Sequence, residues 1–104
     1  MADDLEIAIL TMRFNASDPD ELLSSLSKYV VLTRGHDGCR NVDLCVSVAH
    51  PSQFVIIQKW ESEQHARTHI DSSTMIEMAE ACRGVLSEAP GIELLEGISA
   101  HDLN

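Results

Sequence analysis

Four segments of the chain have the hydrophobic pattern of β-strands. Residues 5–14 form a continuous apolar run with β-branched members, which predicts a strand buried on both faces. Residues 39–49 alternate between apolar and polar side chains, and the run 54–60 ends in the only tryptophan of the chain. After a Pro-Gly pair, residues 92–98 supply the last apolar run. We therefore expect four strands at these positions.

The segment between the first two strands has the periodicity of a helix. Asp18 or Ser17 can cap its start, Pro19 suits the first helical position, and the acidic residues that follow complement the positive end of the helix dipole. Gly35 marks the expected end. Apolar or compact side chains recur between these points at helical spacing: Leu22, Leu26, Tyr29, Val30 and Thr33.

Two shorter helices are expected after the third strand. The first covers 62–70 and begins at Ser62, and the second runs from about Ser73 to Ser87. The apolar stripe predicted for the second helix is Met75, Ile76, Ala79, Cys82 and Leu86. The resulting order, β-α-β-β-α-α-β, is the ferredoxin-like split βαβ arrangement, an α+β sandwich with its helices on one face of the sheet.

Two of the strands carry apolar residues on both faces. On the first strand Ile7 and Ile9 oppose Ala8, Leu10 and Met12, and on the third strand Val55 and Ile57 oppose Phe54 and Ile56. The helices can cover only one face. At about 25 cal/mol per Å², exposing the other would lose several kcal/mol, a large part of the ~5–15 kcal/mol that stabilises a domain. We therefore expect a homodimer in which the same face of a second copy covers it.

Composition and charge restrict the class of protein without changing the fold. A chain of 104 residues, 44 % hydrophobic and 23 % charged, is expected to form one globular domain over 1–104, with its core at 5–98 and a polar tail at 99–104 that frays. The net charge of −10 argues against binding to nucleic acid or to an anionic membrane surface. No apolar run approaches the roughly 20 residues of a membrane helix, and the acidic N-terminus is unlike a signal peptide.

The cysteines indicate a reducing compartment. There are three, an odd number. If Cys39 and Cys45 lie on one strand, they are about 20 Å apart at ~3.3 Å per residue, too far for a disulfide. A cytoplasmic location is therefore expected.

Candidate chemistry gathers where the third strand meets the next helix. Trp60 ends the strand, and Glu61, His65 and His69 follow at intervals of four, which places them on one side of a helix. Three interpretations of the histidines are open: a metal-ligand pair, which lacks an evident third ligand, an acid–base group with a pKa near neutrality, or packing at the helix edge. Trp60 is either a core residue or the flat wall of an aromatic pocket.

The stretch from Phe54 to Ser73 resembles the signature of the antibiotic biosynthesis monooxygenase family. An apolar strand ends in Trp-Glu-Ser at 60–62, the two histidines follow on a helix, and small residues then break the helix. The earlier turn from Arg34 to Cys39, Arg-Gly-His-Asp-Gly-Cys, is similar to the turn that precedes the second strand in this family. Order and length agree over about 5–98, and the small quinol monooxygenases of the family are the most similar in these motifs.

The resemblance implies a dimeric α/β barrel with a ligand pocket between the sheet and the helices of each subunit. The implied reaction is oxygenation of a hydroxylated aromatic, a quinol or a polyketide-like compound, by O₂ without flavin, haem or metal, so no cofactor is expected. His69 would be the base that removes a phenolic proton, Trp60 would hold the ring, and His65 would orient or tune the site. The electron-rich anion could then pass an electron to O₂ itself.

The chain departs from related branches of the family at several positions. The aromatic-polyketide oxygenases have Asn four residues before this tryptophan and Tyr six residues after it, whereas this chain has Ile56 and Ala66. Their anion-stabilising contacts therefore cannot be transferred. The haem-degrading branch is disfavoured, because the first strand has no Asn and the positions of that branch's second Trp and haem-ligating His are occupied here by His69 and about Met78. The alternative function is a non-catalytic, small-molecule-binding or stress-associated module that keeps the fold and the pocket.

Overall fold

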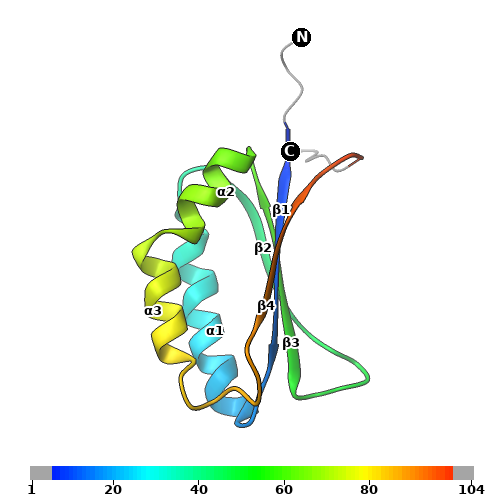
Figure 1. Cartoon of the computed structure of the whole chain (residues 1–104), viewed down its shortest axis with the longest axis vertical. Coiled ribbons are helices and arrows are strands. Elements are labelled where there is room, and N and C mark those ends of the chain that lie inside the picture. The colour runs from blue at the N-terminus through cyan, green and yellow to red at the C-terminus, as the bar shows by residue number, and fades with distance from the viewer. Residues whose placement is uncertain (1–5, 100–104) are drawn as a thin grey trace.

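Three helices cover one face of a four-stranded antiparallel sheet (Figure 1). The structure, a computed structural model, describes residues 6–99. The strands are β1 (Ala8–Asn15), β2 (Cys39–Val46), β3 (Gln53–Trp60) and β4 (Gly91–Glu96), and the helices are α1 (Pro19–Thr33), α2 (Glu63–Ile70) and α3 (Ser73–Ala81). In the sheet the strands lie in the order β2-β3-β1-β4. The element order and the ferredoxin-like α+β fold expected from the sequence are thus confirmed.

The start of α1 follows the sequence signals. The Asp18 side chain accepts a hydrogen bond from the backbone N–H of Glu21, and Pro19 occupies the first turn. All five residues of the predicted stripe are buried: Leu22, Leu26, Tyr29, Val30 and Thr33. The helix ends close to Gly35, but its cap residue is Arg34 in a right-handed conformation. Within residues 6–99 the left-handed φ values belong to Gly38 and Gly84 instead.

The helix-facing side of the sheet forms two apolar clusters. The larger cluster lies under α1 and α3 and includes Met12, Phe14 and Ile56 of the sheet. The smaller cluster lies where α2 packs on the strands and consists of Ala8, Leu10, Trp60 and Ala66. Since Ala8 pairs with Trp60 across β1 and β3, the tryptophan is placed at the end of the sheet beneath α2.

The prediction for α3 was wrong in its length and in part of its buried stripe, of which Met75 and Cys82 are confirmed. The helix ends at Ala81, because the chain turns at Gly84 with a φ of +82° and then pairs Leu86 with Ala16. The buried residues are Thr74, Met75, Met78 and Cys82, whereas Ile76 is 61 % exposed and Ala79 is also exposed. The start of the helix was predicted correctly, and Ser72 caps it by accepting a hydrogen bond from the backbone N–H of Met75.

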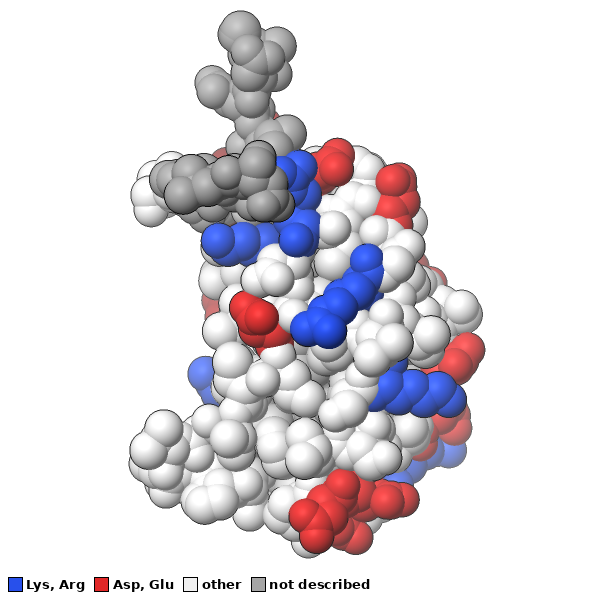
Figure 2. Space-filling model, turned by 180° about the vertical axis from the view of Figure 1, so that it is seen from behind, with Lys and Arg blue, Asp and Glu red and all other residues white. Residues whose placement is uncertain are grey.

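The face of the sheet opposite the helices is left open by residues 6–99. As the alternating pattern predicted, it carries apolar side chains, and Ile57 and Leu95 are each 39 % exposed on it. The β2–β3 loop, residues 47–52, projects beyond the sheet on the side away from the helices (Figure 1). This uncharged loop protrudes at the lower left of Figure 2, and β2 ends before it at Val46 rather than at residue 49.

Two further expectations concern whole-chain properties. No helix within residues 6–99 combines the length and the hydrophobicity that a membrane span requires. Cys39, Cys45 and Cys82 are all unpaired, as the spacing argument predicted for the first two. The fraying tail expected at 99–104 lies, beyond Ser99, outside the described residues.

Candidate active site

Ser62 both begins α2 and holds the ring of His65. Its Oγ accepts a hydrogen bond from the backbone N–H of His65 at 3.1 Å, which is the usual contact of a helix N-cap. The same oxygen lies 2.7 Å from His65 Nδ1. On the other side of the ring, Nε2 lies 3.5 Å from Asp37 Oδ2. Gly38 passes so close that a Cβ at this position would overlap the His65 ring, and its φ of +82° also favours glycine.

His69 lies one turn further along α2 and points into the interior. It is only 2 % exposed, and its ring stacks on Trp60 with a centroid distance of 4.6 Å and an interplanar angle of 30°. Both of its ring nitrogens have partners: Nε2 lies 2.6 Å from the Tyr29 hydroxyl, and Nδ1 lies 3.1 Å from His36 Nδ1. The structure therefore brings Trp60 and His69 together, and it adds two partners that the sequence did not reveal.

The contacts of His69 are part of a longer chain of hydrogen bonds. Trp60 Nε1–H donates to Gln58 Oε1 at 3.1 Å, and Gln58 Nε2–H donates to the Tyr29 hydroxyl at 3.0 Å. At the other end His36 Nε2 lies 3.0 Å from Thr74 Oγ1. Six side chains from β3, α1, α2, the 34–38 turn and α3 are thus connected: Trp60, Gln58, Tyr29, His69, His36 and Thr74. We call this set the buried polar chain.

Burial sets the protonation of the two central groups. Burial, together with the nearby His36 ring, lowers the pKa of His69 to about 4. Burial also raises the pKa of Tyr29 to about 12, despite the opposing influence of Thr33 and Gln58. Near neutral pH, His69 and Tyr29 are therefore both uncharged.

A cavity of about 360 Å³ opens beside these residues, between the 34–38 turn and α2. Its lining residues are His36, Asp37, Gln64, His65, Thr68, His69 and Ser72. The volume lies toward the small end of the range for small-molecule pockets. Three imidazoles reach this one cavity, so it offers groups that can donate or accept a proton.

The sequence-predicted residues occupy different positions around this cavity. His65 and His69 line it, whereas Trp60 is fully buried behind His69 and is not among the lining residues. Glu61 lies 4.0 Å from Arg40 and is not among the residues that line the cavity. Within residues 6–99 no group of three or more His, Cys, Asp or Glu side chains is arranged to hold a metal ion, so the His65/His69 pair gains no third ligand there.

Sequence reasoning missed four members of the site: Tyr29, His36, Gln58 and Thr74. Tyr29 was expected only as part of the apolar stripe of α1, and His36 was noted only as part of the turn from Arg34 to Cys39. One signal was available, because Gln58 is the only polar residue on the buried face of β3, between Ile56 and Trp60. A fully buried amide requires hydrogen-bond partners, and this amide has them in Trp60 and Tyr29.

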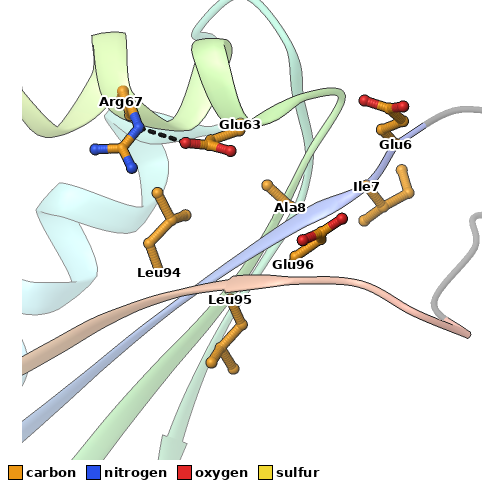
Figure 3. Close-up of a pocket in the computed structure, with 8 residues that line it drawn as sticks. All are labelled: Glu6, Ile7, Ala8, Glu63, Arg67, Leu94, Leu95 and Glu96. Atoms are coloured by element: carbon orange, nitrogen blue, oxygen red, sulfur yellow. Dashed lines mark hydrogen bonds and ion pairs between the residues drawn. The ribbon is translucent and has the colours of Figure 1, made fainter.

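A second cavity, of about 210 Å³, lies on the opposite side of α2 (Figure 3). Figure 3 shows Glu63 and Arg67 of the helix above Ala8 and Leu94 of the sheet. Arg67 Nε forms an ion pair with Glu63 at 2.7 Å, so the one cation among the lining residues is already neutralised. This cavity contains no histidine, which makes the three-histidine cavity the stronger candidate for acid–base chemistry.

Fold and site together define a small ferredoxin-like domain with a cavity lined by three histidines. The family model for antibiotic biosynthesis monooxygenases matches residues 7–81, and the chain belongs to this monooxygenase-like family. No curated protein matches the chain.

Solved structures of the same fold come from several bacteria. Rv0793 from Mycobacterium tuberculosis is 21 % identical over 92 % of this chain and 99 % of its own, with a TM-score of 0.81. A protein of unknown function from Nitrosomonas europaea is 19 % identical over 93 % and 94 %, with a TM-score of 0.81. SnoaB, a cofactor-independent oxygenase from Streptomyces nogalater, is 17 % identical over 85 % and 91 %, with a TM-score of 0.73. At these identities the similarity establishes the fold.

Proposed function

We propose that this chain is a cofactor-independent monooxygenase that oxidises a hydroxylated aromatic, of quinol or polyketide-like type, with O₂. Family membership and the likeness to the oxygenase SnoaB support the reaction class. The single observation that carries the assignment is the uncharged His69, joined to His36 at 3.1 Å beside a cavity of small-molecule size. His69 is the base in this proposal, and the substrate's proton reaches it through the half-buried His36.

The magnitudes are compatible with such a base. A phenol with a pKa near 10, as in tyrosine, would lose its proton to His69, whose conjugate acid has a pKa of about 4, at a cost of about 8 kcal/mol. A turnover of about 10 s⁻¹ corresponds to a barrier of about 16 kcal/mol. Proton transfer therefore uses roughly half of the barrier, and attraction between the phenolate and the imidazolium in a dry site reduces this share.

The remaining steps need no external reductant. The substrate anion transfers one electron to O₂, and the resulting radical and superoxide combine into a peroxide. The histidine pair returns its proton to the peroxide. As the O–O bond breaks, the carbon that bears the peroxide loses its remaining hydrogen, one oxygen atom stays on this carbon as a carbonyl, and the other leaves with both hydrogens as water. Trp60 supports His69 by stacking on its ring, and His65, held by Ser62, orients the substrate at the cavity wall.

We also propose that the functional unit is a homodimer in the cytoplasm. The partly exposed Ile57 and Leu95 support this, because residues 6–99 provide no cover for the open face of the sheet. The three unpaired cysteines are in keeping with a reducing compartment. Light scattering of the purified protein tests the assembly, and a monomeric mass at micromolar concentration would contradict it.

A non-catalytic binding module is the second candidate. One observation favours it: both nitrogens of His69 are already bonded inside the protein, to Tyr29 and His36. The polar family residues replaced here by Ile56 and Ala66 also fit a domain that binds an aromatic without turning it over.

Oxygen uptake separates the two functions. Purified protein is mixed with simple hydroquinones or anthrones, and the wild type is expected to consume O₂ faster than the substrate alone. His69→Ala should reduce the rate by about 10²–10⁴-fold, the usual contribution of a general base, while His50→Ala on the exposed β2–β3 loop serves as the matched control. Uptake that is indifferent to His69→Ala would remove the base role. Aromatic binding without turnover across a broad panel would establish the second candidate.

A further inference from the structure

The buried polar chain begins at a group that can act in only one way. The indole N–H of Trp60 is a donor and has no capacity to accept. It lies 3.1 Å from the side-chain amide of Gln58, so the amide must present its oxygen to the indole. The NH₂ group of the same amide then faces the Tyr29 hydroxyl. The orientation of the amide therefore follows from the chemistry of the indole ring.

This orientation fixes the hydrogen of the Tyr29 hydroxyl. The Tyr29 oxygen accepts from Gln58 at 3.0 Å, and its other partner is His69 Nε2 at 2.6 Å. If His69 Nε2–H were the donor in that contact, the Tyr29 hydrogen would be buried without an acceptor, which is unfavourable. Thr33 does not compete, because its Oγ1 has no hydrogen-bond partner within residues 6–99. Tyr29 therefore donates to His69 Nε2.

The direction continues to the other end of the chain. A neutral imidazole carries one hydrogen, so His69 holds it on Nδ1 and donates to His36 Nδ1 at 3.1 Å. His36 in turn holds its hydrogen on Nε2 and donates to Thr74 Oγ1 at 3.0 Å. Every contact from Trp60 to Thr74 then has one donor and one acceptor, and all donors point the same way along the chain.

We propose that Trp60 and Gln58 are positioning residues that fix the direction of the buried polar chain and thereby the tautomers of its two histidines. In this direction His36 Nε2 carries a hydrogen, so it accepts a proton from a substrate hydroxyl only after the chain reverses. Reversal takes the acceptor away from the Tyr29 hydrogen. The indole N–H thus weakens the histidine pair as a base and keeps it uncharged. The consequence for catalysis rests on the proposed function, whereas the fixed direction does not.

An isosteric analogue of tryptophan tests the direction, because Trp60 is the only tryptophan of the chain. The benzothiophene analogue keeps the shape of the ring and has sulfur in place of the N–H. The Gln58 amide is then free to flip and to accept from Tyr29, so both directions should be populated. Nitrogen-15 NMR should show single tautomers in the wild type, Nδ1–H on His69 and Nε2–H on His36, and mixed tautomers in the protein with the analogue.

The same replacement should change the titration of the histidine pair. A protonated His69 donates from Nε2 to Tyr29, and in the wild type the Tyr29 hydrogen then has no acceptor. With the analogue the Gln58 oxygen accepts it, so the midpoint for protonation of the pair should rise by about one pH unit, the effect of one added hydrogen bond. The other titratable groups around the buried polar chain are the same in both proteins: Lys28 of α1, Asp37 of the 34–38 turn, Cys39 of β2, His65 of α2 and Glu77 of α3.

Two controls make the test specific. A fluorinated tryptophan keeps the N–H and should leave the tautomers and the midpoint as they are in the wild type. Tyr29→Phe removes the link between Gln58 and His69. Introducing the benzothiophene ring into this variant should therefore change neither the tautomers nor the midpoint beyond the effect of Tyr29→Phe alone.

The inference is overturned if the wild type carries Nε2–H on His69, or if the benzothiophene ring leaves either the tautomers or the midpoint unchanged. If the NMR changes occur and the wild type shows no O₂ uptake, the fixed direction stands and the oxygenase assignment fails. If uptake is present, the analogue should raise kcat about threefold to tenfold with KM little changed, because proton transfer follows the strength of the base. An equal or lower kcat would refute the catalytic consequence.

Discussion

The two ends of the layer between the helices and the sheet are held together in different ways. Under α1 and α3, Met12, Phe14, Leu26 and Ile56 pack as a continuous apolar cluster. Near α2 the buried side chains include Trp60, Tyr29, His69 and Gln58, and each of these has a hydrogen-bond partner within the same set. The first end is stabilised by apolar side chains that fill the interior, and the second by matched hydrogen-bond donors and acceptors.

This difference separates stability from chemistry within one small domain. An apolar cluster contributes stability in proportion to the area it buries. A buried polar network is favourable only when its members are satisfied, and it contains groups that can exchange protons. Changes at the apolar end should therefore alter stability and leave the titration of His69 unchanged, and changes at the polar end should do the opposite.

The largest effect is expected from Leu26→Ala at the apolar end. Leu26 is completely buried on α1, and truncating such a leucine destabilises a protein by about 2–5 kcal/mol. Urea unfolding measures the loss, with Ser27→Ala on the exposed side of the same helix as the control. The midpoint for protonation of His69, measured by NMR, should not move. A stability loss below about 1 kcal/mol, the range of a surface change, would mean that this end is not the main source of stability.

Most of the apolar end could be predicted from the sequence, because helical and strand periodicities are local properties. The stripe from Leu22 to Thr33 and the alternation in β3 follow directly from spacing. The error in the length of α3 has a local cause that periodicity does not detect: the helix ends at Ala81 and the chain turns at Gly84, where φ is +82°.

The polar end could be predicted only in part. The proximity of Trp60 and His69 was expected, but the buried polar chain joins residues 58 and 29, 29 and 69, and 69 and 36. Such contacts depend on how α1 and the 34–38 turn pack against α2, which no local pattern encodes. Gln58 was the available signal, as a polar residue where the alternation of β3 requires an apolar one.

The second largest effect is expected from acid, which should lower the free energy of unfolding through His69 at the polar end. The pKa of His69 is about 4 in the folded protein and returns to about 6.5 on unfolding. Between these values the unfolded chain binds more protons, so stability falls as the pH falls from 6.5 to 4. The contribution of His69 approaches about 3 kcal/mol at the lower limit.

The measurement for this second prediction is the free energy of unfolding between pH 4 and pH 7 in the wild type and in His69→Gln. The glutamine variant keeps the carboxylate titrations that both proteins share and removes that of the imidazole. Its stability should depend less steeply on pH over this window. Equal slopes in the two proteins would show that His69 titrates normally and that the polar end is open to water.

The smallest effect on stability should come from Gln58→Leu, and this variant tests the comparison most directly. The substitution leaves the Trp60 indole N–H without an acceptor, a loss of about 1–3 kcal/mol. The buried leucine recovers part of this loss, so the net cost in stability should be about 1 kcal/mol.

The effect of Gln58→Leu on the hydrogen bonds of the site should be larger than its effect on stability. Without the Gln58 amide, the Tyr29 oxygen has one donor fewer, and its contact with His69 Nε2 is less constrained. NMR should show the indole N–H resonance of Trp60 shifted and the His69 tautomer less well defined, while Leu26→Ala should change neither. If Gln58→Leu instead costs as much as Leu26→Ala and leaves the His69 resonances in place, the polar end is structural in the same sense as the apolar end, and the division between them does not hold.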